Sequence, residues 1–168
     1  QKASYTAPDC RQRILVSSVD ARLFALDAHS CSVCAGFVNA GFVDLKDQMG
    51  PTEATKRYPP PAAPVVMGHL PVVCGCVRDI MPGEPSGVVR AFDVRDGSLA
   101  WAWDVGNPDN TQAPAPEQTY TLSTPNGWTA PTDDKEIKLV YLPTGKGPPE
   151  YWGGERNAGK GCGGAAGV

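Results

Sequence analysis

The residues best suited to chemistry by type and spacing are four of the cysteines. Cys31-x-x-Cys34 has a spacing that suits zinc, and Cys74-x-Cys76 would have to supply the second pair of ligands. Two cysteines separated by a single residue are too close for a standard zinc knuckle, and the two pairs lie far apart in the chain. The spacing therefore argues against a zinc site.

Carboxylates and histidines offer acid and base chemistry as the alternative. Glu84, Asp93 and Asp104 are candidate general bases, but each stands where a turn or blade-face role is the more common one. His29 and His69 fall in predicted turns or loops, where exposed histidines are usual. From the residues alone we assign no catalytic group.

Strands must position these side chains, and the clearest strand signal lies at 88–94. This run is short, β-branched at its start and bounded by Ser-Gly and Asp-Gly pairs, which predicts a strand rather than a helix. Asp96-Gly97 then closes a hairpin onto 99–103, where Trp101 and Trp103 share a face. We expect two faces on the first strand: Val88, Arg90, Phe92 and Val94 on one side, and Val89, Ala91 and Asp93 on the other.

A weaker copy of this hairpin occurs upstream. Ala25-Leu26-Asp27 overlays Ala91-Phe92-Asp93, and Cys31 falls where the second copy has its turn glycine, Gly97. The proline-rich connections at 49–64 and 106–118 cannot be central strands. Further strands are expected at 13–18, 22–27, 65–66 and 72–73, with a charged turn at 133–135.

Composition excludes some functions. The net charge is −3 and the 15 basic residues are scattered, so no nucleic-acid partner is expected. With 19 Gly and 17 Pro the chain suits an all-β protein with long loops. No apolar run approaches the roughly 18 residues of a spanning helix.

Longer strings between about positions 10 and 156 resemble one family. They are similar to the membrane-bound quinoprotein dehydrogenases that use pyrroloquinoline quinone (PQQ), among them glucose, quinate and shikimate dehydrogenases. The Ala-x-Asp repeat likewise resembles that of PQQ β-propellers, in which Ala and Trp pack between blades. The strings are Arg13-Ile-Leu-Val, Asp20-Ala-Arg-Leu, Gly41-Phe-Val-Asp-Leu, Gly83-Glu-Pro-Ser-Gly-Val-Val-Arg-Ala-Phe-Asp, Trp101-Ala-Trp-Asp, Thr124-Pro-Asn, Leu139-Val-Tyr-Leu-Pro-Thr-Gly and Tyr151-Trp-Gly-Gly.

The resemblance implies an all-β fold with W-shaped antiparallel blades. At about 40 to 50 residues per blade, the chain has room for about two to three blades of a PQQ-type β-propeller. We expect residues 1–156 to form this partial propeller. The Gly-rich tail, 157–168, should be disordered or derive from a non-native reading frame, because it has little apolar surface to offset its ordering entropy.

The same resemblance implies a function. The chain would be a segment of a dehydrogenase that oxidises glucose or a related sugar or polyol, with PQQ and Ca²⁺ or Mg²⁺ as cofactors, and passes electrons to ubiquinone. Its place would be the periplasmic side of the bacterial inner membrane, with the membrane anchor upstream of this segment. The general base would lie beyond its end, so the isolated segment should be inactive. The alternative is a non-catalytic propeller module for interaction or assembly.

The resemblance also assigns site residues. Asp79 matches the charged member of an Asp-Asn pair in the family and is expected to bind both cofactor and metal, whereas Ile80 replaces the Asn. Lys146 stands where relatives often carry a metal-binding Asn, so it would hydrogen-bond a carboxylate of the cofactor rather than a cation. Cys10 and Cys34 match cysteines of relatives and could form a disulfide. Cys31 replaces a turn glycine, at a cost of up to about 1 kcal/mol if its φ is positive.

Overall fold

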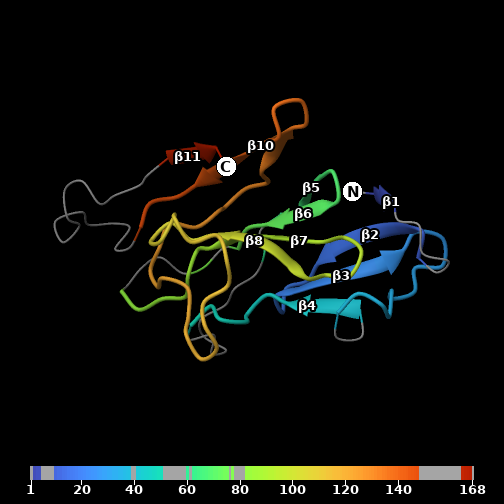
Figure 1. The fold of residues 1–168 in the computed structure, drawn as a ribbon, viewed down its shortest axis with the longest axis horizontal. Helices are drawn as coiled ribbons and strands as arrows, with labels where there is room; N and C mark the ends of the chain where they lie inside the picture. Colours follow the sequence, from blue (N-terminus) through green and yellow to red (C-terminus); the bar gives the residue numbers. More distant parts are fainter. Residues whose placement is uncertain are drawn as a thin grey trace.

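The computed structural model describes residues 2–4, 10–38, 41–50, 60, 62–75, 77, 82–147 and 164–167. Their strands form two four-stranded sheets and one three-stranded sheet, and all strand pairs are antiparallel. Figure 1 shows the second sheet, in green and yellow, between the blue-to-cyan first sheet and the orange-to-red third sheet. The prediction of an all-β fold with two to three blades is confirmed.

Strands that follow one another in the chain are neighbours in each sheet. The first blade contains β1 (Lys2–Ser4), β2 (Gln12–Ser17), β3 (Arg22–Asp27) and β4 (Phe42–Asp44). The second contains β5 (Val65–Met67), β6 (Leu70–Val73), β7 (Val89–Phe92) and β8 (Leu99–Trp103). The third contains β9 (Thr132–Asp134), β10 (Leu139–Thr144) and β11 (Gly164–Gly167). The predicted strands in the first two blades and the predicted hairpin are confirmed.

Strand β7 is buried on both faces and separates two hydrophobic cores. Val88, Phe92 and Val94 belong to the core shared with the first blade, which includes Leu23 and Phe37. The other side of the strand belongs to a core shared with the third blade: Val89 and Ala91 pack there with Val140 and Leu142, and Trp101 and Trp103 pack against it. The expected division of the two faces is therefore correct.

The two Ala-x-Asp copies fold alike. In each, the Asp N–H donates to a carbonyl five residues on, and its carbonyl accepts the N–H four residues on, from Cys31 in the first copy and Gly97 in the second. Cys31 has φ 59° and Gly97 has φ 76°. Cys31 thus occupies a left-handed position that favours glycine, as expected.

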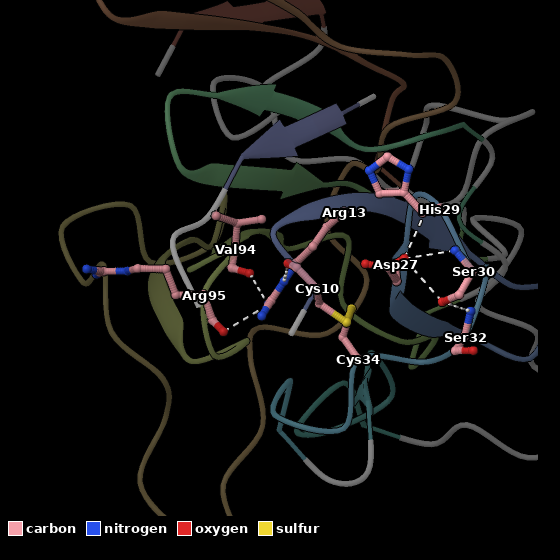
Figure 2. Close-up of a disulfide and its surroundings, with 9 residues drawn as sticks. All are labelled: Cys10, Arg13, Asp27, His29, Ser30, Ser32, Cys34, Val94 and Arg95. Carbon is pink, nitrogen blue, oxygen red and sulfur yellow. Dashed lines mark hydrogen bonds between the residues drawn. A yellow bond between two sulfur atoms is a disulfide. The ribbon is translucent and has the colours of Figure 1, made fainter. Parts of the chain in front are cut away.

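Two buried arginines join the first and second blades from opposite sides. Arg13 of β2 donates from Nη1 to the carbonyls of Val94 (2.6 Å) and Arg95 (2.9 Å), as Figure 2 shows. Arg90 of β7 donates back to the carbonyls of Leu45 and, at 3.3 Å, Asp47. Charge-assisted bonds to loop carbonyls satisfy these groups where water is excluded.

A disulfide between Cys10 and Cys34 closes the first blade, with Cα atoms 5.9 Å apart (Figure 2). It confirms the pairing that the resemblance suggested. It also uses Cys34, so Cys31-x-x-Cys34 is not a zinc pair. In the chain-entropy model such a loop contributes about 3 kcal/mol to stability.

The third blade differs from expectation in two places. Asp133 and Asp134 belong to β9, and the turn lies at 135–138 instead, because Thr132–Asp134 pairs with Leu139–Tyr141 as an edge strand. Residues 164–167 pair with β10, whereas the Gly-rich tail was expected to be disordered or to derive from a non-native reading frame. Backbone hydrogen bonds form this edge strand without any need for large side chains. The remainder of the tail, 157–163 and 168, lies outside the described residues.

In the part of the chain that the structure describes, no helix has the length and apolar character needed to cross a membrane.

Candidate cofactor site

Three irregular segments run side by side between the second and third blades: 83–87, 123–127 and 145–147. Gly83 N–H donates to Ser123 Oγ (2.7 Å), and Ser123 N–H donates to the Glu84 carbonyl (3.0 Å). Further along, Gly87 N–H donates to Thr124 Oγ1 (2.8 Å). Side-chain hydroxyls thus replace the sheet ladder and hold the first two segments together.

Gly87 is required by the closeness of these two segments. A Cβ on Gly87 would lie 2.0 Å from the Pro125 carbonyl oxygen and 2.9 Å from Asn126 Cα. Both are backbone atoms that cannot move aside, so no larger residue fits. The Gly-Glu-Pro-Ser-Gly string therefore has a structural role at its second glycine.

The third segment also contacts 123–127. Gly145 N–H donates to the Asn126 carbonyl (2.9 Å), and Gly127 forms a β-bridge with Thr144. A Cβ on Gly145 would lie 3.1 Å from Trp128 Nε1, so the indole rests directly against this glycine. Trp128 is 49% exposed.

Two buried side chains at these segments hold polar atoms without hydrogen-bond partners. Asn126 is fully buried, and neither its Oδ1 nor its Nδ2 has a partner. Glu84 is 3% exposed, and its Oε2 has none. Each buried group left unpaired costs about 1–3 kcal/mol, and native proteins keep few of them. A ligand bound at these segments would satisfy them.

Lys146 belongs to the third of these segments, 145–147. It follows Gly145, whose N–H binds the Asn126 carbonyl, and its side chain is exposed. Asp79, together with Ile80, lies outside the described residues, four positions before Gly83 in the chain. The structure therefore brings one of the two expected site residues to the candidate site and does not describe the other.

The other two carboxylates considered from the sequence, Asp93 and Asp104, bind nearby side-chain and backbone N–H groups. The Arg95 guanidinium, followed by the Arg95 backbone N–H, holds the pKa of Asp93 below its usual range. Asp104 accepts the N–H groups of Gly106 (3.0 Å) and Thr121 (2.7 Å). Among the described residues, no group of three or more His, Cys, Asp or Glu side chains is placed to hold a metal ion.

Comparison with known proteins identifies the family. The model of the PQQ family, described as the glucose/ethanol/alcohol dehydrogenase β-propeller domain, matches residues 1–164. The chain belongs to this PQQ β-propeller family. This chain is 38% identical over 149 residues to quinoprotein glucose dehydrogenase of Escherichia coli, and the match covers 88% of this chain and 19% of that protein.

Two other relatives match this chain over a similar length. The glycerol dehydrogenase large subunit of Gluconobacter oxydans is 36% identical over 157 residues, and the quinate/shikimate dehydrogenase (quinone) of Acinetobacter baylyi is 34% identical over 151 residues. These matches cover 88% and 89% of the PQQ-family chain and 20% and 19% of the two relatives. The chain thus spans about a fifth of the curated relatives it matches.

Solved structures agree on the fold. Quinohemoprotein alcohol dehydrogenase from Comamonas testosteroni superposes with a TM-score of 0.57 at 17% identity, covering 82% of this chain and 20% of that one. A europium-containing methanol dehydrogenase gives a TM-score of 0.57 at 16% identity, covering 89% and 26%. At this identity the likeness shows the propeller fold alone.

The residues present fit the family's cofactor chemistry. A divalent cation such as Ca²⁺ prefers carboxylate and amide oxygens, and Glu84 Oε2 and Asn126 Oδ1 are oxygens of these kinds without partners. A planar quinone with carboxylates suits an exposed indole and an exposed ammonium group, as Trp128 and Lys146 provide. The sequence pattern gives Glu84 a turn or blade-face role and assigns no role to Asn126, because the burial of both side chains depends on contacts between distant segments.

Proposed function

We propose that this chain is a cofactor-binding segment of a PQQ-dependent dehydrogenase that oxidises glucose or a related sugar or polyol. The observation that carries the proposal is the set of unpartnered buried atoms of Glu84 and Asn126 beside an exposed Trp128 and Lys146. Relatives named for glucose, glycerol and quinate support this substrate class. Transfer of electrons to ubiquinone and a place on the periplasmic side of the bacterial inner membrane belong to the same proposal.

Each residue has a proposed role at the site. Trp128 stacks on the plane of PQQ, and Lys146 pairs with one of its carboxylates. Glu84 and Asn126 supply oxygens to Ca²⁺ or Mg²⁺, and Asp79 adds a further carboxylate to metal and cofactor. When bound, PQQ supplies the quinone that accepts the hydride of the alcohol. We assign no general base within this chain, so we expect cofactor binding without turnover.

A titration with PQQ tests the proposal. The purified chain is titrated with and without Ca²⁺ or Mg²⁺, following PQQ absorbance and tryptophan fluorescence. Lys146→Ala removes the proposed partner of a cofactor carboxylate, and Lys135→Ala is its matched control at an exposed lysine in the 135–138 turn. Loss of one charge-assisted bond of about 1.5–3 kcal/mol corresponds to a roughly tenfold to hundredfold weaker affinity.

Saturable binding that weakens in Lys146→Ala but not in Lys135→Ala supports the proposal. A folded chain that binds no PQQ, with or without metal, contradicts it. That result would favour the alternative of a non-catalytic propeller module.

A further inference from the structure

The first blade holds the second at the turn formed by residues 93–98, which we call the docking turn. Arg13 of β2 is 3% exposed and donates from Nη1 to the carbonyls of Val94 (2.6 Å) and Arg95 (2.9 Å). Figure 2 shows the guanidinium pointing at these two backbone carbonyls. Charge-assisted bonds of this kind tie the position of the docking turn to that of the arginine.

A second part of the first blade reaches the same turn. Val38 N–H donates to the carbonyl of Asp96 (2.9 Å). Gly97 lies so close to this loop that a Cβ on it would be 2.5 Å from Val38 Cγ2 and 3.2 Å from the ring of Phe37. Three consecutive carbonyls of the docking turn, at positions 94, 95 and 96, therefore accept hydrogen bonds from the first blade.

The disulfide joins these two contacts. The Cys10 carbonyl accepts a hydrogen bond from Arg13 Nε (3.2 Å), so one guanidinium binds both a half-cystine residue and the docking turn. The Cys34 carbonyl accepts the N–H of Phe37 (2.9 Å), in the loop that continues to Val38. The covalent bond holds the Cα atoms of the two cysteines 5.9 Å apart, and it therefore sets the spacing between the arginine and the loop.

We infer that the disulfide between Cys10 and Cys34 controls how firmly the first blade docks on the second, and that its reduction loosens this contact. While the bond is closed, Arg13 and the loop at 34–38 stand at the spacing that fits the docking turn. Once the bond is open, the two contacts move independently, and the hydrogen bonds to the docking turn weaken. The inference does not depend on PQQ binding and is tested without the cofactor.

Reduction takes two electrons from a dithiol. A thiolate of the reductant attacks Cys10 Sγ, the S–S bond breaks, and Cys34 leaves as a thiolate that takes up a proton. The second thiol of the reductant then displaces Cys10, whose sulfur takes up the second proton, and the reductant becomes a cyclic disulfide. Attack begins at Cys10 because this residue is half-buried, whereas Cys34 is 2% exposed.

A disulfide that acted only as a cross-link would behave differently. In the chain-entropy model it restricts the unfolded chain and leaves the contacts of the folded chain unchanged. Here the bond is coupled to contacts of the folded chain, and such coupling is reciprocal. If reduction weakens the docking of the blades, then weakening the docking at Arg13 must make the disulfide easier to reduce by the same factor.

Equilibrium reduction of the purified chain by dithiothreitol tests this reciprocity, with the state of Cys10 and Cys34 measured by alkylation and mass spectrometry. Arg13→Lys keeps the charge but loses the planar fork of donors. Arg90→Lys is the matched control, because Arg90 joins the same two blades through carbonyls outside the docking turn. We expect half-reduction at similar dithiothreitol concentrations in wild type and Arg90→Lys, and at an about tenfold lower concentration in Arg13→Lys.

An equal shift in both variants would show that the disulfide responds only to overall stability and would overturn the inference, as would no shift in Arg13→Lys. If Arg13→Lys does not fold by circular dichroism, native-state hydrogen exchange on the wild-type chain provides the test. Reduction should speed exchange at Val38 N–H about tenfold more than at Gly145 N–H, which donates to Asn126 outside the first blade. Equal acceleration of the two amides would also overturn the inference.

Discussion

Replacing Arg90 should destabilise the fold strongly, because this side chain links the second blade to the first. Its guanidinium is buried, donates to the carbonyls of Leu45 and Asp47, and lies 5.8 Å and 5.9 Å from the ring centroids of Phe92 and Tyr120. Arg90→Ala removes both charge-assisted bonds and leaves two carbonyls poorly satisfied. We expect the free energy of unfolding to fall by about 3–5 kcal/mol.

Urea denaturation followed by circular dichroism and tryptophan fluorescence measures this loss. Arg95→Ala is the control: Arg95 pairs with Asp93, but its side chain is 56% exposed, so its loss should cost no more than about 1 kcal/mol. Arg90→Lys keeps the charge but has fewer hydrogen-bond donors, so its loss of unfolding free energy should lie between those of Arg90→Ala and Arg95→Ala. If Arg90→Ala unfolds within about 1 kcal/mol of wild type, the arginine link between blades does not contribute as argued.

Three further changes test other parts of the account. Asn126→Ala removes an unpartnered buried amide, so the free energy of unfolding measured in urea should stay within about 1 kcal/mol of wild type. The affinity for PQQ, measured by titration, should fall by about tenfold or more. Asn107→Ala, at an exposed loop position, should change neither quantity. The pKa of Asp93 is lower in the folded chain than in the unfolded one, so ionised Asp93 stabilises the fold above the unfolded pKa of about 3.9, and this stabilisation is lost as pH falls through the folded pKa. In urea denaturation measured from pH 6 downward, Asp93→Asn should therefore lose less stability on acidification than wild type. Cys31→Gly should raise the free energy of unfolding by up to about 1 kcal/mol and with it the urea midpoint, because φ at Cys31 is 59°. An unchanged or lower midpoint would contradict the argument that Cys31 is strained.

Local pattern was enough to predict the second blade. The alternation at 88–94 assigned each side chain to one of two faces, and both faces are filled by neighbouring blades. The overlay of Ala25 on Ala91 placed Cys31 at the position of the turn glycine, and φ is positive there. These features depend on strand period and turn chemistry, which a sequence shows directly.

The candidate site was harder to predict because it is built by contacts between distant segments. Nothing local to Glu84 or Asn126 shows that both side chains are buried without full pairing. The contact of Trp128 with Gly145, 17 positions later, likewise joins segments that are not adjacent in the chain. The two strands that the sequence did not predict, β9 and β11, are the outer strands of the three-stranded blade and pair with β10.

The coupling between metal and PQQ at Glu84 tests the central claim most directly. PQQ affinity is measured with Ca²⁺ and with a chelator, in wild type, in Glu84→Gln and in Glu136→Gln, a control at an exposed turn residue. We predict that Ca²⁺ raises PQQ affinity about tenfold in wild type and in Glu136→Gln, and that the gain disappears in Glu84→Gln. An equal gain in all three proteins, or none in wild type, would contradict a metal-assisted cofactor site between the second and third blades.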